Sequence, residues 1–262
     1  MSITVWDMNP VLLSIGPLHL RWYGLLFASG IFSGLYILRW IYRREGRDVD
    51  ETDDLLLYAI AGIVVGARLA HCLIYEPSYY LSHPIEILFV WRGGLASHGG
   101  LLGMFLATWL FCKKHGISFV WLVSRLTIPG SLFAFFVRMG NFFNSEILGR
   151  ASDAPWAIIF ARYDGIPRHP AQLYEAIAYL LIFTILLLLY MKLDRQKTTA
   201  LLPGIFFTLV FSARFFIEDF KMRQASYAMD MAMSVGQLLS IPFILMGIVW
   251  FSVGLVSIVK SD

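Results

Sequence analysis

The feature that most constrains this chain is a series of seven long apolar stretches. They run over about 18–38, 54–75, 97–112, 118–137, 171–191, 200–220 and 234–258. An apolar run of about 20 residues is long enough to cross a bilayer as a helix. At 58% hydrophobic and 15% charged residues, the chain departs far from the composition of soluble domains. The sequence therefore predicts an all-α integral membrane protein, one polytopic domain over residues 1–262 with about seven transmembrane helices.

Basic residues between these stretches predict how the helices are oriented. They gather after the first, third and fifth stretches and at the C-terminus: Arg39, Arg43, Arg44, Arg47, Lys113, Lys114, Lys192, Arg195, Lys197 and Lys260. With seven spans all of these turns lie on one face, which the positive-inside rule makes cytoplasmic. The N-terminus is then outside and the C-terminus inside. Residues 144–170, which follow the fourth stretch, are expected to form a small periplasmic head.

The other basic residues do not follow this rule, because they fall within the stretches or at their outer ends. They are Arg21, Arg68, Arg92, Arg125, Arg138, Arg150, Arg162, Arg168, Arg214, Lys221 and Arg223. A basic side chain near the bilayer centre costs on the order of 3 kcal/mol. Snorkelling to the outer headgroups explains some of them. The remainder favour a cavity that faces the outer leaflet and binds an anionic group.

Residues 138–150, RMGNFFNSEILGR, form the richest polar motif and follow the fourth stretch. The motif contains Arg138, Asn141, Glu146 and Gly149. Guanidinium groups can bind phosphate oxygens through two parallel hydrogen bonds, and glycine lets the backbone approach a ligand closely. The alternative is a polar helix terminus capped by amides.

Two further motifs carry titratable groups. His98 lies between paired glycines in 93–103, GGLASHGGLLG, and is a candidate proton acceptor at the membrane face. The alternative is a structural histidine bonded to a backbone carbonyl. Arg214, Glu218 and Lys221 are spaced to share one helical face at the outer end of the sixth stretch. The alternative for these three is an ion-paired helix surface of little energetic worth.

Smaller signals lie in the first two stretches. Tyr23 belongs to the segment RWYG at 21–24, where an aromatic belt at the membrane interface is the simpler interpretation. In the second stretch, Arg68 and His71 are expected to pair with Glu76 or with groups from other helices. Cys72 and Cys112 lie in apolar surroundings and are expected to serve packing alone.

At these residues the chain resembles the prolipoprotein diacylglyceryl transferase family, over nearly its whole length. The shared motifs are RWYG at 21–24, DDLLLYA at 53–59, GARLAH at 66–71, SHGGLLG at 97–103, RMGNFFNSEILGR at 138–150, RHPAQLYEA at 168–176, RFFIEDFK at 214–221 and SVGQLLSIP at 234–242. The resemblance implies a seven-span enzyme of the bacterial inner membrane. Its expected activity is transfer of diacylglycerol from phosphatidylglycerol to the lipobox cysteine of a preprolipoprotein signal peptide, with release of sn-glycerol 1-phosphate.

The resemblance also implies roles for single residues. His98, Arg138 and Arg214 match the positions most often tied to activity. Tyr23, Asn141, Glu146, Gly149 and Glu218 match further essential or substrate-binding positions. Two positions depart from the family: Lys221 stands where arginine is common, and Ser124 replaces a frequent aspartate. Lys221 is still expected at the substrate, but without the two-pronged hydrogen bonding of arginine.

The chemistry of this reaction indicates which step each candidate residue is expected to assist. A thiol with a pKa of about 8.5 is mostly protonated at neutral pH, so His98 is expected to accept its proton. Arg138 and Arg214 are expected to hold the phosphate of the membrane lipid. No metal, cofactor or nucleic-acid partner is expected. The competing interpretations are a transporter or channel for an anionic solute and a non-catalytic lipid-binding protein; a transporter predicts paired halves of similar hydropathy, which the sequence lacks.

Overall fold

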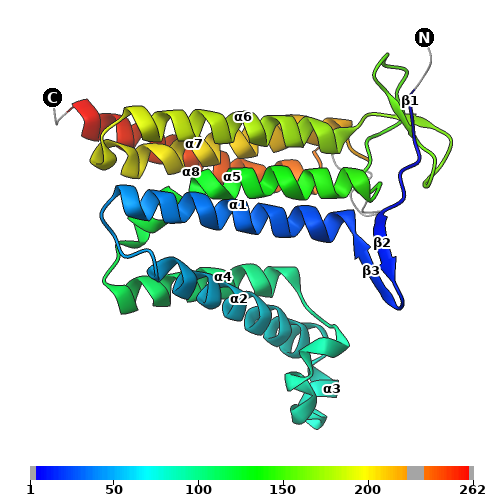
Figure 1. Ribbon diagram of the computed structural model, residues 1–262, viewed down its shortest axis with the longest axis horizontal. Helices are drawn as coiled ribbons and strands as arrows, with labels where there is room; N and C mark the ends of the chain where they lie inside the picture. Colours follow the sequence, from blue (N-terminus) through cyan, green and yellow to red (C-terminus); the bar gives the residue numbers. More distant parts are fainter. Residues whose placement is uncertain (1–3, 223–232, 260–262) are drawn as a thin grey trace. The chain divides into compact units, whose positions relative to one another are not determined.

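The structure is a computed structural model that describes residues 4–222 and 233–259, most of them in helices (Figure 1). The α-helices are α1 (Trp22–Arg44), α2 (Glu51–Ala70), α3 (Pro77–Ser82), α4 (Ser97–His115), α5 (Phe119–Phe143), α6 (Ala171–Lys192), α7 (Arg195–Ile217) and α8 (Val235–Val259). One π-helical turn, η1 (His71–Tyr75), continues α2. Shorter 3-10 turns are η2 (Pro84–Leu88), η3 (Val90–Arg92) and η4 (Glu218–Phe220). Two residues used in the charge argument, Arg223 and Lys260, lie outside the described residues.

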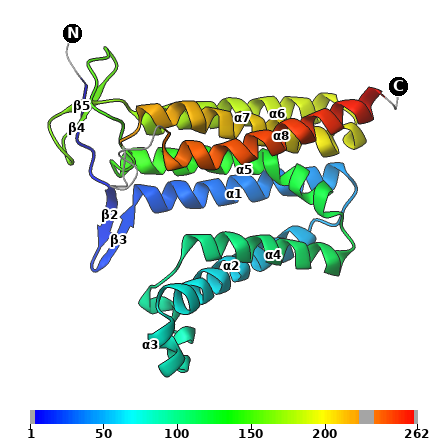
Figure 2. The ribbon, with the colours of Figure 1, turned by 180° about the vertical axis from the view of Figure 1, so that it is seen from behind.

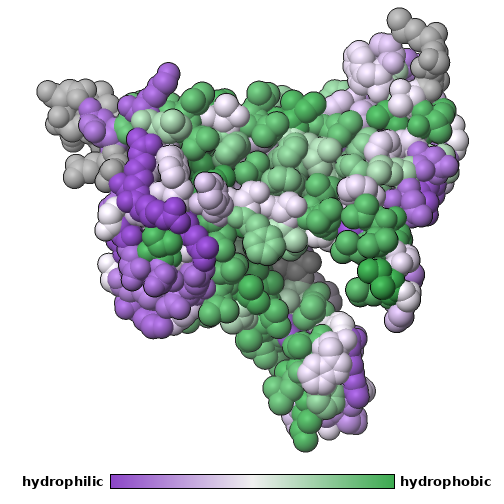
Figure 3. All heavy atoms as spheres, in the orientation of Figure 1, coloured by the Kyte–Doolittle hydropathy of each residue, from purple (hydrophilic) through white to green (hydrophobic). Residues whose placement is uncertain are grey.

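Within the described residues, six helices are long and apolar enough to cross a membrane. They cover Trp22–Arg44, Glu51–Tyr75, Phe119–Phe143, Ala171–Lys192, Lys197–Phe220 and Val235–Val256. Large hydrophobic side chains such as Phe32 and Leu101 are exposed. Hydrophobic residues cover much of the surface seen in Figure 3, as lipid contact requires. The remaining predicted span is also a helix, α4, but polar residues at both its ends dilute its apolar character. The prediction of a multi-pass helical protein is confirmed, and the count of seven spans stays a prediction.

The predicted start of the first span is wrong, and the spans predicted over 18–38 and 118–137 continue further, to Arg44 and Phe143. The first helix begins at Trp22 rather than near residue 18, because Leu18–Arg21 is strand β3, paired antiparallel with β2 (Val11–Ile15). The hairpin turns at Gly16, whose φ of +56° suits a residue without a side chain. The sixth predicted span, 200–220, agrees with the apolar run Lys197–Phe220, whose last turn is tighter because α7 stops at Ile217 and η4 follows it.

The chain divides into two compact units. Unit 1 comprises residues 1–38 and 123–262, and unit 2 comprises residues 39–122. In unit 1, helices α5, α6, α7 and α8 run side by side (Figures 1 and 2). Glycines permit the close approach of α7 and α8, since a Cβ at Gly247 would collide with the backbone of Thr208. Gly30 lets α1 approach the ring of Phe133 on α5 in the same way.

A small sheet lies beyond the ends of the unit 1 helices. Strand β1 (Thr4–Trp6) pairs in parallel with β4 (Ile158–Phe160), and β4 pairs antiparallel with β5 (Pro167–Arg168). Trp6 packs on Phe142 at the end of α5, with ring centroids 4.3 Å apart. The 144–170 segment is therefore a folded extension of the helices; its position on the periplasmic side stays a prediction.

In unit 2, helices α2 and α4 pack at very short range. Gly62 and Gly66 of α2 face Gly99 and Gly103 of α4, and a Cβ at any of the four would collide with the opposite backbone or with an alanine. The contact places the first turn of α4, which carries His98, directly against α2. The close packing of α2 and α4 thereby holds the helix turn that carries His98 in a fixed position within unit 2.

Candidate functional site

The last turns of α5 carry two predicted site residues, Arg138 and Asn141. Arg138 donates a hydrogen bond from Nη1 to Asn141 Oδ1 at 3.3 Å, and Asn141 Nδ2 donates to Glu146 Oε2 at 3.2 Å. Between them, Gly140 lies against the ring of Tyr23, near the start of α1. A side chain at residue 140 would displace that ring. Arg138, Asn141 and Glu146 are therefore linked by hydrogen bonds at the end of α5, and Tyr23 of α1 packs beside them.

The turn after α5 is conformationally unusual. Ser145 and Ile147 both have φ of +56°, in the left-handed region that a β-branched residue such as Ile147 rarely adopts. Such conformations cost on the order of 1–3 kcal/mol each and persist where surrounding contacts impose them. Glu146 lies between them, with its backbone N–H donating to Asn141 O at 2.9 Å and its C=O accepting from Gln172 Nε2 at 2.5 Å. The turn therefore directs the Glu146 carboxylate back towards Asn141.

Glu175 on α6 is the centre of the charged cluster and is completely buried. Its Oε2 lies 2.9 Å from Arg138 Nε, and its Oε1 lies 3.0 Å from Lys221 Nζ and 3.8 Å from Arg214 Nη1. The hydroxyl of Tyr179, one turn along α6, also reaches Oε1 at 3.4 Å. One carboxylate thus joins three cations from α5, from α7 and from the segment after α7. A buried charge of this kind requires such partners.

The end of α7 supplies the other side of the cluster. Arg214 lies in its last turn, Glu218 opens η4 and Lys221 follows η4 in extended conformation. The spacing of the three residues predicted that they share one face of a continuous α-helix. That prediction is wrong, because α7 ends at Ile217 and a 3-10 turn follows it. They still converge: Lys221 Nζ lies 3.1 Å from Glu218 Oε2, and both line the same cavity as Arg214.

Gly149 connects this segment to the turn after α5. It forms an isolated antiparallel bridge with Lys221, and its N–H donates to His169 O at 3.1 Å. A Cβ at residue 149 would collide with the carbonyl oxygens of His169 and Phe220. Only glycine fits here, and its small size lets the Lys221 backbone approach the strained turn.

The cluster opens into a cavity of about 210 Å³. Its walls are Arg138, Ile147, Arg214, Glu218, Lys221, Met222 and Gly236. Three cations and one carboxylate among these residues give the wall a formal charge of +2 (3 − 1), with Glu175 buried behind it. The Arg214 side chain is the most exposed of the three cations, at 33%, against 12% for Arg138 and 9% for Lys221. The cavity is suited to an anionic group, bound by guanidinium and ammonium donors in surroundings of low dielectric.

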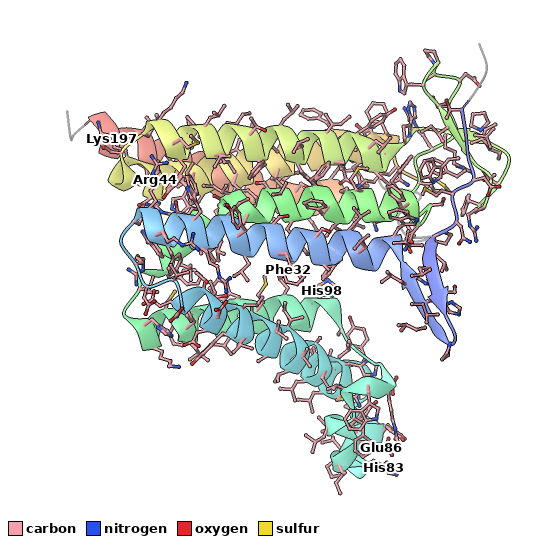
Figure 4. The ribbon with its side chains drawn as sticks, in the orientation of Figure 1. Phe32, Arg44, His83, Glu86, His98 and Lys197 are labelled. Atoms are coloured by element: carbon pink, nitrogen blue, oxygen red, sulfur yellow. The ribbon has the colours of Figure 1, made fainter. Side chains whose placement is uncertain are left out.

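His98 belongs to unit 2, whereas the other predicted site residues belong to unit 1. It lies in the first turn of α4 with its side chain exposed (Figure 4). The smaller predictions have mixed outcomes. His71 Nε2 lies 3.6 Å from Glu76 Oε1 as expected, whereas Arg68 donates to backbone carbonyls. Ser124 accepts a hydrogen bond from Arg125 and donates one to Thr198 O, so it is part of the packing between α5 and α7.

The principal residue that sequence reasoning missed is Glu175. It belongs to the motif 168–176 and is an acidic residue in the apolar run of 171–191, which is a signal comparable with those of Arg138 and Arg214. Gln172, also fully buried one turn earlier, was missed in the same motif and binds the backbone of Glu146.

Comparison with known proteins gives a consistent result over almost the whole chain. A family model described as prolipoprotein diacylglyceryl transferase matches residues 10–253. The chain is 53% identical over 245 residues to the phosphatidylglycerol–prolipoprotein diacylglyceryl transferase of Tolumonas auensis, covering 93% of this chain and 95% of the relative. Proteins of the same name from Chloroherpeton thalassium and Bacteroides fragilis are 50% and 40% identical, over 94% and 93% of this chain and 92% of each relative.

Proposed function

The chain belongs to the prolipoprotein diacylglyceryl transferase family, and on this premise we propose that it transfers the diacylglyceryl group of phosphatidylglycerol to the lipobox cysteine of prolipoproteins. This is the first step of lipoprotein maturation. The cysteine sulfur forms a bond to the terminal glycerol carbon of the diacylglyceryl group, and the bond from that carbon to the phosphate oxygen breaks. The phosphate keeps the oxygen and leaves as sn-glycerol 1-phosphate, while the thiol loses its proton.

The observation that carries the proposal is that Arg138 and Arg214, from separate helices, line one cavity together with Lys221. The phosphodiester of phosphatidylglycerol is a singly charged anion, and its departing form gains negative charge as the carbon–oxygen bond breaks. Cations fixed in advance at that position stabilise the transition state more than the ground state. Each donor of this kind typically contributes roughly 3–4 kcal/mol, or 10²–10³ in rate.

The remaining residues of unit 1 prepare these donors. Glu175 and Asn141 hold Arg138 at two of its nitrogens, and Glu146 in turn fixes the Asn141 amide. Lys221 contributes a point charge rather than a fork, because an ammonium cannot bind two oxygens in one plane. The ring of Tyr23 packs against Gly140, between Arg138 and Asn141 in the sequence. We assign substrate binding to Tyr23, Asn141, Glu146, Gly149, Glu218 and Lys221.

We assign to His98 the role of accepting the proton from the thiol of the prolipoprotein cysteine. The thiolate is the competent nucleophile, and a neutral imidazole is the side chain whose pKa lies nearest to neutral pH. The exposed position of His98 at the start of α4 leaves its ring accessible to a peptide substrate. The nucleophile belongs to the prolipoprotein, so the enzyme needs no cysteine of its own.

The membrane arrangement follows from the same proposal. We assign α4 as a seventh crossing, the N-terminus and residues 144–170 to the periplasmic side, and the whole chain to the bacterial inner membrane as a single polytopic domain. Support comes from the basic residues that end α1 and α4, Arg43, Arg44, Lys113 and Lys114, which then lie in the cytoplasm. The phosphatidylglycerol consumed would come from the outer leaflet.

A reconstituted assay tests the function. Purified protein in phosphatidylglycerol vesicles is incubated with a lipobox peptide, and both the lipid-shifted peptide and free glycerol phosphate are measured. We expect both products in equal amounts, and a loss of roughly 10²–10³ in rate for Arg138→Ala and for Arg214→Ala. Arg162→Ala, an exposed arginine of the 144–170 segment, is the control and should keep full activity. Wild-type rates in both site variants would overturn the assignment, and absence of peptide product would overturn the function.

A further inference from the structure

The segment between α3 and α4 is built around one arginine of α2. Arg68 Nε donates to Ile87 O at 2.9 Å and Nη2 donates to Glu86 O at 2.6 Å. Its Nη1 donates to Gly93 O at 2.7 Å and to Gly94 O at 3.3 Å. All four acceptors are main-chain carbonyls, two at each end of residues 86–94. Four of the five N–H groups of a guanidinium can be engaged in this way.

Burial makes these hydrogen bonds important. Arg68 is only 3% exposed, and its guanidinium lies over the ring of Tyr80, 5.0 Å from the ring centroid. A buried guanidinium needs acceptors, and carbonyls of a segment without continuous helix need donors. The hydrogen bonds from Arg68 to these carbonyls meet both needs at once.

The same contacts lead directly to His98. Gly93 and Gly94 have φ of +85° and +70°, which turns their carbonyls towards Arg68. Two residues later, the N–H of Ala96 donates to Ala67 O at 3.0 Å, so the chain is attached to α2 beside Arg68 just before α4 begins. Gly99 then packs against Gly66. His98 therefore lies between two attachments to α2, one through Ala96 and one through Gly99.

We propose that Arg68 is a positioning residue for the transfer reaction: its fork onto the carbonyls of residues 86, 87, 93 and 94 fixes the entry into α4 and with it the position of His98. This inference rests on the proposed function, in which His98 takes the thiol proton. The glycine contact sets the distance between α4 and α2, whereas Arg68 sets the direction from which the chain enters α4. Arg68 contributes to catalysis only through His98 and does not touch the substrate.

Lysine cannot replace Arg68 in this role. An ammonium group has three donors on one nitrogen, whereas the four carbonyls lie around a planar group with donors on three nitrogens. Arg68→Lys keeps the charge and leaves part of the carbonyl set unpaired. The conservative variant therefore separates geometry from charge.

Transfer kinetics give the first test. We expect Arg68→Lys to lower kcat by up to about 10²-fold, the effect of misplacing a catalytic group by about 1 Å, with little change in KM for the peptide. In a His98→Gln background the same substitution should change kcat less than twofold, because the group it positions is already absent. Arg92→Lys, an exposed residue of the same segment, is the control and should retain wild-type kcat. Full activity in Arg68→Lys, or an equal fall in both backgrounds, would overturn the proposal.

A second variant and a second measurement keep the test decisive if Arg68→Lys accumulates poorly. Gly93→Ala introduces a methyl group into open space but strains the backbone, which turns away the carbonyl that Arg68 Nη1 binds. Gly116→Ala, with φ of +64° and equally open space at the end of α4, is its control. Gly93→Ala should lower kcat in the wild-type background and change it less than twofold in the His98→Gln background. Gly116→Ala should leave kcat unchanged in both.

Hydrogen exchange separates this proposal from the proposed function. In membrane-embedded protein, amides of residues 86–98 should exchange at least tenfold faster in Arg68→Lys and in Gly93→Ala, and amides of α6 should not change. Unchanged exchange at 86–98 would refute the role of Arg68 whatever the activity. A wild-type protein without transfer activity but with this exchange pattern would refute the proposed function alone.

Discussion

Replacing Glu175 by glutamine tests whether one carboxylate organises the charged cluster. The substitution conserves shape but removes the charge that Arg138, Lys221 and Arg214 face at 2.9, 3.0 and 3.8 Å. Removing one partner of a buried ion pair typically costs about 3–5 kcal/mol, since the other charge remains buried. Here three cations lose their common partner, and Glu218, 3.1 Å from Lys221, is the carboxylate that remains beside them in the cavity wall. We therefore expect a loss in the free energy of unfolding of about 3–5 kcal/mol.

The assay is unfolding by SDS titration in mixed micelles, followed by tryptophan fluorescence, with and without glycerol phosphate. Because the variant leaves the cations without Glu175, the anion should stabilise it more than it stabilises the wild type; ligand at about 100 times Kd contributes about 2.7 kcal/mol. Glu76→Gln is the control: that carboxylate is 53% exposed and lies 3.6 Å from His71, so its loss should cost under about 1 kcal/mol. Equal stability of Glu175→Gln and wild type, or an equal response of both to the anion, would refute the argument.

Three further expectations can be checked with single variants. Gly149→Ala should lower the transfer rate at least tenfold while the helical circular dichroism is retained, because a methyl group there displaces Lys221 by pushing on the carbonyls of His169 and Phe220. The double variant Cys72→Ala/Cys112→Ala should keep the transfer rate within about twofold, because both thiols are buried packing groups; a larger fall would implicate one of them in the reaction. The hydrogen bond from Arg168 lowers the pKa of Asp164 below its ordinary 3.8, so this pair stabilises the folded state above that pH and ceases to do so as the pH falls through the lowered pKa. Hydrogen exchange of β4 and β5 should accordingly differ between wild type and Asp164→Asn at neutral pH and converge in strong acid; a difference that persists in acid would contradict this.

The helices were predictable from the sequence because lipid imposes a simple requirement. A spanning segment must be apolar over its length, so each of the seven stretches is a helix in the structure, with boundaries shifted by a few residues. The N-terminal hairpin was not predicted, because the strands Val11–Ile15 and Leu18–Arg21 are as apolar as the start of a span. Apolar character alone does not distinguish a short strand from a helix.

The site was predictable in its parts but not in its assembly. Arg138 and Arg214 are conspicuous because charged groups are rare in apolar runs, and both line the cavity. That they meet through Glu175 depends on the rotation of α6 against α5 and α7, which is set by side-chain packing over the whole length of the helices. The tightening of α7 at Ile217, which brings Lys221 to Glu218, likewise depends on contacts made by the following segment.

The complete burial of Glu175 affects how an enzyme of this kind would turn over. Three cations against Glu175 and Glu218 leave a formal charge of +1 (3 − 2). A phosphodiester of charge −1 balances that charge, whereas glycerol phosphate, a monoester with charge near −2 at neutral pH, exceeds it. The spent headgroup is therefore held less well than the cations alone would hold it, and its escape to water is favoured. In the proposed phosphate site, a carboxylate among the cations would therefore reduce inhibition by the released product.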